Sequence, residues 1–117
     1  KQERWEKMVL NAAQQCEVRW LPQLKPLRPV DAILPTLKEY DLVLIGSLYE
    51  GTSPFRAVDV AGKKRVALLI GPEGDFTREE VEAAIQAGAV PISFGDRILR
   101  TETAAIFGLS VLAYELL

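Results

Sequence analysis

Apolar residues recur along this chain with two different spacings, which separate the expected helices from the expected strands. In the first segment they recur every three or four residues, as on one face of a helix: Trp5, Met8, Val9, Ala12, Ala13 and Cys16. Charged residues occupy many of the positions between them. We therefore expect a helix over ERWEKMVLNAAQQC, residues 3–16, with its apolar face laid on the core of the domain.

Continuous apolar runs predict buried strands in three places: residues 41–47 (DLVLIGS), 65–70 (RVALLI) and 89–94 (AVPISF). Runs without polar alternation are typical of a parallel sheet that is covered on both faces. A shorter run, RWLPQL at residues 19–24, is interpreted as a further strand that ends at the proline-rich KPLRP.

Two helices are expected between these strands. Residues 31–40 make a short helix with Pro35 near its first turn. Thr77 and Glu80 form a capping box that opens the next helix, and Gly88 stands where a glycine commonly ends one. This helix joins two of the expected strands, so residues 65–94 form a βαβ unit.

A last helix is expected to begin at Thr101 or Thr103 and to continue to residue 116. Its residues are apolar nearly all round. Such a helix is either wedged into the core or shared with a second subunit.

The amino-acid composition limits the kinds of catalytic and binding site that the protein can have. The 117 residues suffice for one domain, and the formal net charge of -2 gives no overall basic signal of a nucleic-acid binder. The chain has no histidine and one cysteine, Cys16, which argues for a reducing compartment and against zinc sites and histidine-dependent triads. Its longest apolar run, residues 104–117, is too short to span a bilayer. We expect a cytoplasmic protein with no metal and no membrane segment.

Three expected strands end in glycine-bearing loops: IGSLYEGTSPF, IGPEGDF and FGDRILRTET. In a parallel sheet these carboxyl ends lie at one edge, where α/β proteins bind ligands. Neither GxGxxG nor GxxxxGK[ST] is present, so the dinucleotide and P-loop motifs are missing. Gly71 and Gly74 either turn the chain only or bring its backbone close to a ligand.

The third loop, FGDRILRTET, has more charged and polar residues than a turn requires. Two arginines, Arg97 and Arg100, flank the apolar pair Ile98–Leu99 immediately before the last helix. They either form a solvated face or, for Arg100 beside a helix N-terminus, contact an anionic or carbonyl-bearing ligand.

The combination of GPEG at 71–74 with RILRTETA at 97–104 resembles the C-terminal pattern of the RsmE family. These proteins are 16S ribosomal RNA (uracil-N3)-methyltransferases of the SPOUT superfamily. The segments ERWEKMVLNAAQQC and LYE also resemble family segments, and the similarity covers essentially the whole chain. The sequence departs from the usual family pattern at Gln14, Val18 and Asp96, where the family commonly has glutamate, arginine and proline.

The resemblance implies an α/β fold: a SPOUT-type parallel sheet flanked by helices, with a C-terminal deep trefoil knot. It also implies that the loops of the knot hold S-adenosylmethionine. Carried over by position, the cofactor-binding residues are Leu48, Ile70, Gly71, Pro72, Glu73, Gly74, Gly95, Ile98, Leu99, Arg100, Thr101, Thr103 and Ala104. A neutral ribose and a sulfonium need no phosphate cradle, which agrees with the missing phosphate-loop motifs.

For methyl transfer to uracil N3, Arg100 is the expected catalytic residue nearest the reaction, because a fixed cation stabilises charge that develops on the base. Glu102 either accepts the N3 proton or caps the last helix. The partner implied is 16S ribosomal RNA within the small ribosomal subunit, and the expected assembly is a homodimer. Basic residues near the N-terminus either touch RNA phosphates or only solubilise the surface: Lys7, Arg19, Lys25 and Arg28.

Residues 1–117 are therefore expected to form the methyltransferase domain without its first strand and helix, and without the family's N-terminal RNA-binding domain. Two alternatives belong to other classes. One is a knotted domain that binds RNA or protein without catalysis, which weak cofactor binding would favour. The other is a flavodoxin-like nucleotide-binding domain, which would need a phosphate site that the sequence does not offer.

Overall fold

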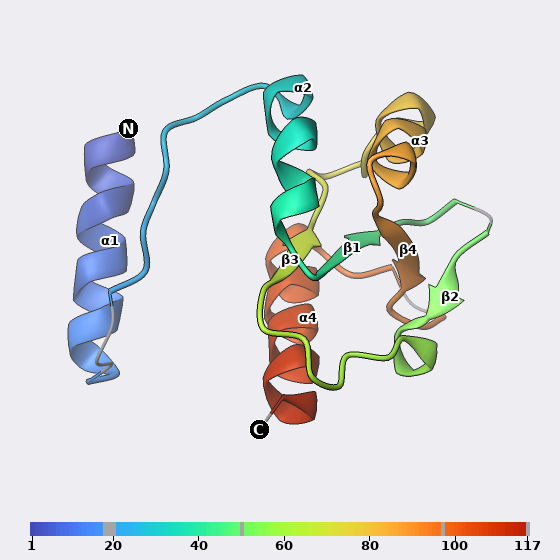
Figure 1. Ribbon diagram of the computed structural model, residues 1–117. Helices are drawn as coiled ribbons and strands as arrows, with labels where there is room; N and C mark the ends of the chain where they lie inside the picture. The colour runs from blue at the N-terminus through green and yellow to red at the C-terminus, as the bar shows by residue number, and fades with distance from the viewer. Residues whose placement is uncertain (18–20, 50, 97, 117) are drawn as a thin grey trace.

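The computed structural model describes residues 1–17, 21–49, 51–96 and 98–116. This part of the chain contains four α-helical segments and four strands, which Figure 1 labels. The elements in chain order are α1 (Gln2–Gln15), α2 (Val30–Ile33), the 3₁₀ helix Leu34–Glu39, β1 (Leu42–Gly46), β2 (Ser53–Pro54), the 3₁₀ turn Phe55–Ala57, β3 (Val66–Leu69), α3 (Arg78–Gln86), β4 (Val90–Ser93) and α4 (Thr101–Glu115).

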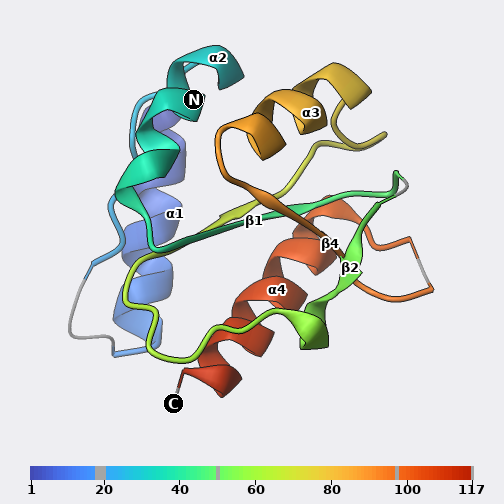
Figure 2. The same cartoon turned by 45° about the vertical axis from the view of Figure 1, so that its right-hand side comes forward.

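The four strands form one parallel sheet in the order β2-β4-β1-β3. Helices cover both of its faces, with α4 on one side and α2 and α3 on the other (Figure 2). The pleat of β1 explains both layers, because successive side chains of a strand point to opposite faces. Val43 and Ile45 pack with α3, whereas Leu44 packs with Ile92 and Leu112. The predicted α/β class with a covered parallel sheet is confirmed.

The capping box predicted at the start of α3 is also confirmed. The backbone N–H of Glu80 donates to Thr77 Oγ1 at 3.1 Å, and Glu80 Oε1 accepts from the backbone N–H of Thr77 at 2.8 Å. Gly88 follows the helix with φ of 106°, a left-handed conformation in which glycine carries no Cβ penalty. The βαβ unit therefore forms where local sequence signals and the hydrophobic pattern agree.

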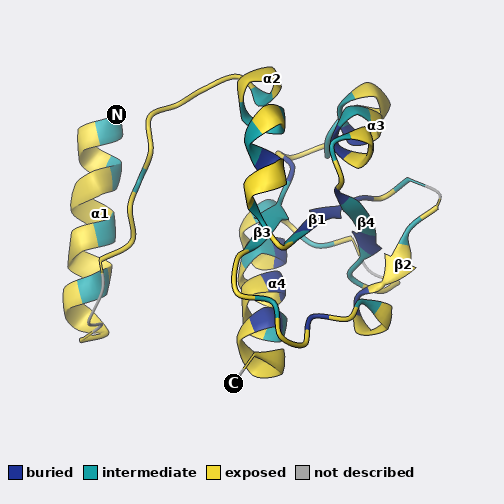
Figure 3. Ribbon diagram, viewed as in Figure 1, coloured by how far each residue is buried: buried dark blue, intermediate teal, exposed yellow. Residues whose placement is uncertain are grey.

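Helix α1 does not pack on the core as expected. None of its residues is buried, and the helix stands at the side of the molecule (Figures 1 and 3). Trp5, Val9 and Ala13 are only half-buried, and Met8 is exposed. The periodicity predicted the helix correctly but could not say which surface covers its apolar stripe.

Two other predictions are corrected. The segment expected as one helix over 31–40 is a single α-turn followed by a 3₁₀ helix, because Pro35 has no N–H to continue the α-helical ladder. In the expected strand at 19–24, residues 19 and 20 lie outside the described residues, and residues 21–24 are irregular. Strand β2 was not predicted, since it is two residues long and includes Pro54, which has no N–H to donate to a neighbouring strand.

Helix α4 buries one side against the sheet, as the first of its two expected arrangements requires. Its buried residues Ala104, Gly108 and Leu112 lie on one face, against the sheet. A Cβ at Gly108 would come within 2.5 Å of Leu68 Cδ2, so the helix packs very close to β3. The other face is exposed although it is apolar, with Ile106 at 67% and Leu109 at 60% exposure. No helix in the described ranges is long and apolar enough to cross a membrane.

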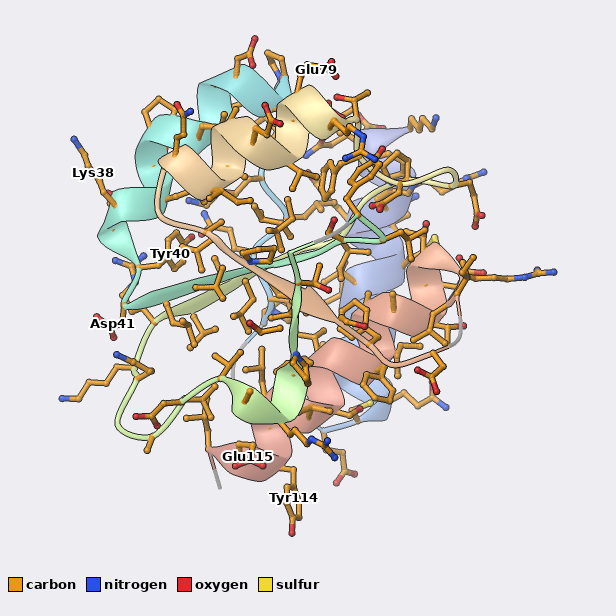
Figure 4. The ribbon with its side chains drawn as sticks, turned by 90° about the vertical axis from the view of Figure 1, so that its right-hand side faces the viewer. Lys38, Tyr40, Asp41, Glu79, Tyr114 and Glu115 are labelled. Atoms are coloured by element: carbon orange, nitrogen blue, oxygen red, sulfur yellow. The ribbon has the colours of Figure 1, made fainter. Side chains whose placement is uncertain are left out.

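The amino ends of β1 and β3 are held together by Asp41. Its Oδ2 accepts hydrogen bonds from the backbone N–H groups of Lys64 and Arg65, both at 2.9 Å. The bonds from Arg65 and Lys64 lower the pKa of the Asp41 carboxyl, because they favour its charged form. Figure 4 shows Tyr40 and Asp41 at the start of β1, and the Arg65 guanidinium lies 4.9 Å from the Tyr40 ring. This end of the sheet is therefore fixed by structural contacts.

Candidate functional site

A pocket lies at the opposite, carboxyl edge of the sheet, where β1, β3 and β4 end. Its walls come from the loop after β1, the turn after β3, and the segment that leads from β4 into α4. The space between the walls is about 630 Å³, part of which is open to solvent. A pocket at this edge of a parallel sheet lies where α/β proteins bind their ligands.

Most residues expected to bind a cofactor are brought together here. Those that line the pocket are Leu48, Ile70, Gly71, Pro72, Glu73, Gly74, Gly95, Ile98, Leu99, Thr101 and Ala104. Arg100 and Thr103, from the same expected set, are exposed and do not line it. Arg97 lies outside the described residues.

Sequence reasoning missed five lining residues: Gly46, Ser47, Asp75, Ser93 and Phe94. Gly46 and Ser93 are the last residues of β1 and β4, and Ser47 and Phe94 follow them directly. The rule that ligands lie at the carboxyl ends of parallel strands could therefore have found all four. Asp75 gave no such signal. Its importance depends on its backbone conformation, which the sequence does not reveal.

The turn after β3 folds back so that Gly71 lies close to Asp75 and Phe76. Gly71 is buried, and a Cβ placed on it would lie 2.9 Å from both Asp75 Oδ1 and the backbone nitrogen of Phe76. Gly74 and Asp75 both have left-handed backbone, with φ of 87° and 69°. The turn is closed by a hydrogen bond of 2.8 Å from the N–H of Asp75 to the carbonyl of Pro72. Gly71 is therefore required for this close approach, beyond the simple turning of the chain.

Helix α4 is attached directly to that turn. The Thr101 hydroxyl donates to the Gly71 carbonyl at 3.0 Å, although the two residues are thirty positions apart. Thr101 is the first residue of α4, and Arg100 is its N-cap. The Arg100 side chain makes no capping hydrogen bond. Arg100 is exposed beside the pocket, and the exposed Glu102 follows in the first turn of α4.

The loop that leaves β4 has its own polar contacts. The N–H of Gly95 donates to Ser93 Oγ at 3.1 Å, and the Ser93 hydroxyl lies 3.2 Å from the Gly95 carbonyl. Gly95 has φ of 108°, so a residue with a side chain would be strained there. Ile98 follows in the same loop with 77% of its surface exposed, and it gives the mouth of the pocket an apolar surface.

The charges and polarity of the pocket indicate what it can hold. The charged residues among the described part of its lining are Glu73 and Asp75, both carboxylates. Leu48, Ile70 and Leu99 supply apolar surface beside them. Such walls suit an organic molecule with an apolar body and a positive charge. In the described residues, no group of three acidic or thiol side chains could hold a metal ion.

Comparisons with known proteins agree with this chemistry. A family model described as "RNA methyltransferase domain" matches residues 1–113. The chain is 33% identical to ribosomal RNA small subunit methyltransferase E of Bacillus subtilis, over 98% of this chain and 47% of that protein. The protein of the same name from Buchnera aphidicola subsp. Schizaphis graminum is 37% identical, over 92% of this chain and 43% of its own length.

A solved structure is also similar. It is the ribosomal RNA small subunit methyltransferase E of Neisseria gonorrhoeae bound to S-adenosyl methionine. The TM-score is 0.90 at 25% identity, and the match covers 98% of this chain and 48% of that one. The present chain thus spans about half the length of the relatives that it matches.

Proposed function

This chain belongs to the RNA methyltransferase family, and from that membership we propose that it is the catalytic domain of an S-adenosylmethionine-dependent ribosomal RNA methyltransferase. The proposed acceptor is N3 of a uridine in 16S ribosomal RNA of the small subunit. The observation that carries the proposal is the pocket at the carboxyl edge of the sheet, which unites the GPEG turn with the start of α4.

The residues of the pocket fit the proposed cofactor. Its sulfonium is positively charged, and Glu73 and Asp75 supply negative charge in the lining. Buried Gly71 keeps the turn free of a side chain, and Leu48 and Leu99 offer apolar surface for an adenine ring. When bound, the cofactor supplies an electrophilic methyl group. The chain's own residues would bind it and orient the acceptor base beside it.

Arg100 and Glu102 are the proposed groups that act on the base. Both are exposed at the N-terminus of α4, outside the lining of the pocket, so they face the side from which RNA would approach. The Arg100 guanidinium would stabilise the negative charge that develops on uracil as N3 loses its proton. Glu102 would accept that proton. The base would have to leave its stack to reach this rim.

The first test is calorimetric titration of the protein with S-adenosylmethionine, followed by transfer of a labelled methyl group to undermethylated small ribosomal subunits. We expect one cofactor site per chain, and label in 16S ribosomal RNA that maps to N3 of a uridine. A folded, dimeric sample that binds no cofactor would contradict the proposal and favour a knotted domain that only binds RNA or protein.

We also propose the SPOUT arrangement for the domain, including the C-terminal deep trefoil knot. The resemblance of GPEG and RILRTETA to the family pattern supports it, and the hydrogen bond from Thr101 to the Gly71 carbonyl joins these two segments. Residues 1–117 would lie within this domain, and the family model that matches residues 1–113 supports that reading. The single cysteine supports a cytoplasmic location.

A homodimer through α4 is the proposed assembly. Ile106 and Leu109 stand one turn apart on the exposed side of the helix, and Tyr114 extends the apolar surface to its end (Figure 4). Apolar surface of this kind is typical of a protein interface.

We expect Leu109→Glu to produce a monomer, because a buried carboxylate without a partner is costly at an apolar interface. Light scattering coupled to size-exclusion chromatography would measure the mass. Lys38→Glu, at an exposed site far from α4 (Figure 4), should leave the dimer unchanged. If Leu109→Glu stays dimeric, α4 is not the interface.

A further inference from the structure

The carboxylate of Asp75 joins two walls of the pocket. Its Oδ2 accepts a hydrogen bond from the backbone N–H of Leu48 at 3.0 Å, across twenty-seven positions of sequence. Its Oδ1 accepts from the backbone N–H of Phe76 at 2.8 Å. One side chain thus connects the loop after β1 with the turn after β3. Hydrogen bonds to a charged acceptor are stronger than those between neutral groups.

A second set of contacts connects the same two segments. The Tyr49 hydroxyl donates to the Phe76 carbonyl at 2.7 Å, and the Arg78 guanidinium lies 4.6 Å from the centre of the Tyr49 ring. The N–H of Tyr49 donates to Ser47 Oγ at 3.1 Å. Leu48, between them, is 60% exposed and contributes little packing of its own. The position of this loop therefore depends on polar contacts with the turn after β3.

The backbone of Asp75 argues that its side chain has a role. With φ of 69°, Asp75 is in the left-handed region, where a residue with a Cβ is less stable than glycine. Glycine would fit the turn without that cost. The two hydrogen bonds that the Asp75 carboxylate accepts offset the conformational cost of its left-handed backbone.

We propose that Asp75 is a positioning residue, whose carboxylate holds Leu48 in the pocket wall and keeps the site ready for its ligand. The inference rests on the proposed function for the identity of that ligand, S-adenosylmethionine. Without the carboxylate the backbone at Leu48 loses its bond to the turn, and part of the binding free energy is spent on ordering this wall again. The N–H of Leu48 then exchanges with solvent more freely.

Two substitutions separate the roles of backbone and carboxylate. Asp75→Gly relieves the strained φ but removes both hydrogen bonds to the side chain. We expect its affinity for S-adenosylmethionine to fall about 10- to 100-fold, as when a bond to a charged group is lost. Asp75→Asn keeps one acceptor oxygen and tolerates left-handed backbone, so its loss should be about 3-fold. Asp59→Asn is the control, because Asp59 accepts from the Ala61 N–H in a loop outside the pocket.

Hydrogen exchange of individual amides supplies a readout that does not need the cofactor. In Asp75→Gly the Leu48 amide should exchange at least about 10-fold faster, while that of Ile45 in β1 stays as in the wild type. Unchanged affinity together with unchanged Leu48 exchange would overturn the proposal. Equal loss of affinity in both Asp75 variants without faster Leu48 exchange would also overturn it, because the carboxylate would then act on the ligand by charge alone. If the wild type binds no cofactor, the proposed function fails, and Leu48 exchange still decides whether Asp75 holds the loop.

Discussion

Replacing Gly71 by valine should abolish binding of S-adenosylmethionine to this protein. The first carbon of the new side chain would lie 2.9 Å from Asp75 Oδ1 and from the Phe76 nitrogen, and 3.2 Å from the Asp75 carbonyl carbon. Two of these neighbours are backbone atoms, which cannot turn aside as the end of a flexible side chain can. The turn after β3 must therefore move, and it would carry the Asp75 contact with Leu48 and the Thr101 contact with the Gly71 carbonyl.

The expected size of the effect is a loss of at least about 100-fold in affinity, since the moved turn would lose the bonds to Leu48 and Thr101 that hold two walls of the pocket. Overpacking should also lower the free energy of unfolding by about 1–3 kcal/mol. Calorimetry would measure the affinity and urea denaturation the stability. Gly62→Ala is the control: Gly62 has φ of 75° and open space around it, so alanine should cost about 1 kcal/mol of stability without affecting binding. Normal cofactor affinity in a folded Gly71→Val protein would contradict our account of the turn.

The core of the fold could be predicted because several local signals agreed. The capping box at Thr77, the glycine at 88 and the apolar runs on either side all indicated one βαβ unit, which the structure contains. Each signal depends on neighbours within a few residues, and these are what a sequence shows most directly.

The errors concern contacts between distant segments. The periodicity of α1 specified an apolar face but not the surface that would cover it, and the described chain buries none of its residues. Strand β2 has two residues and is held by β4 alone, so it has almost no pattern of its own. The order of the strands and the packing of α4 beside β3 likewise depend on long-range contacts.

In the candidate site, too, sequence patterns predicted some residues, and contacts between distant segments were missed. Gly71, Gly95 and Leu99 were predicted from the resemblance to the RsmE family, and they lie in loops at the ends of parallel strands, where ligands bind. Asp75 was missed because its significance lies in a left-handed φ and in a hydrogen bond to Leu48. Neither feature can be read from GPEGDF alone, since an aspartate in a turn more often makes local hydrogen bonds only.

The location of Arg100 predicts that its substitution lowers the rate of methylation much more than the affinity for the cofactor. Because Arg100 lies at the rim and does not line the pocket, Arg100→Ala should leave the dissociation constant of S-adenosylmethionine within about 3-fold of the wild type. Its side chain makes no capping bond, so the substitution should cost little stability. In the proposed role, however, the guanidinium stabilises charge on the base, and kcat for methylation of small ribosomal subunits should fall about 100- to 1000-fold.

Single-turnover methylation, with cofactor binding measured on the same samples, would test this separation of binding from catalysis. Arg100→Lys keeps the charge but loses the planar pair of donors, so it should recover only part of the rate. Arg56→Ala, at an exposed site outside the pocket, should retain full activity. If Arg100→Ala methylates at the wild-type rate, another group must stabilise the base. A rate restored by Arg100→Lys to the wild-type level would mean that the positive charge alone is sufficient, whatever the geometry of its donors.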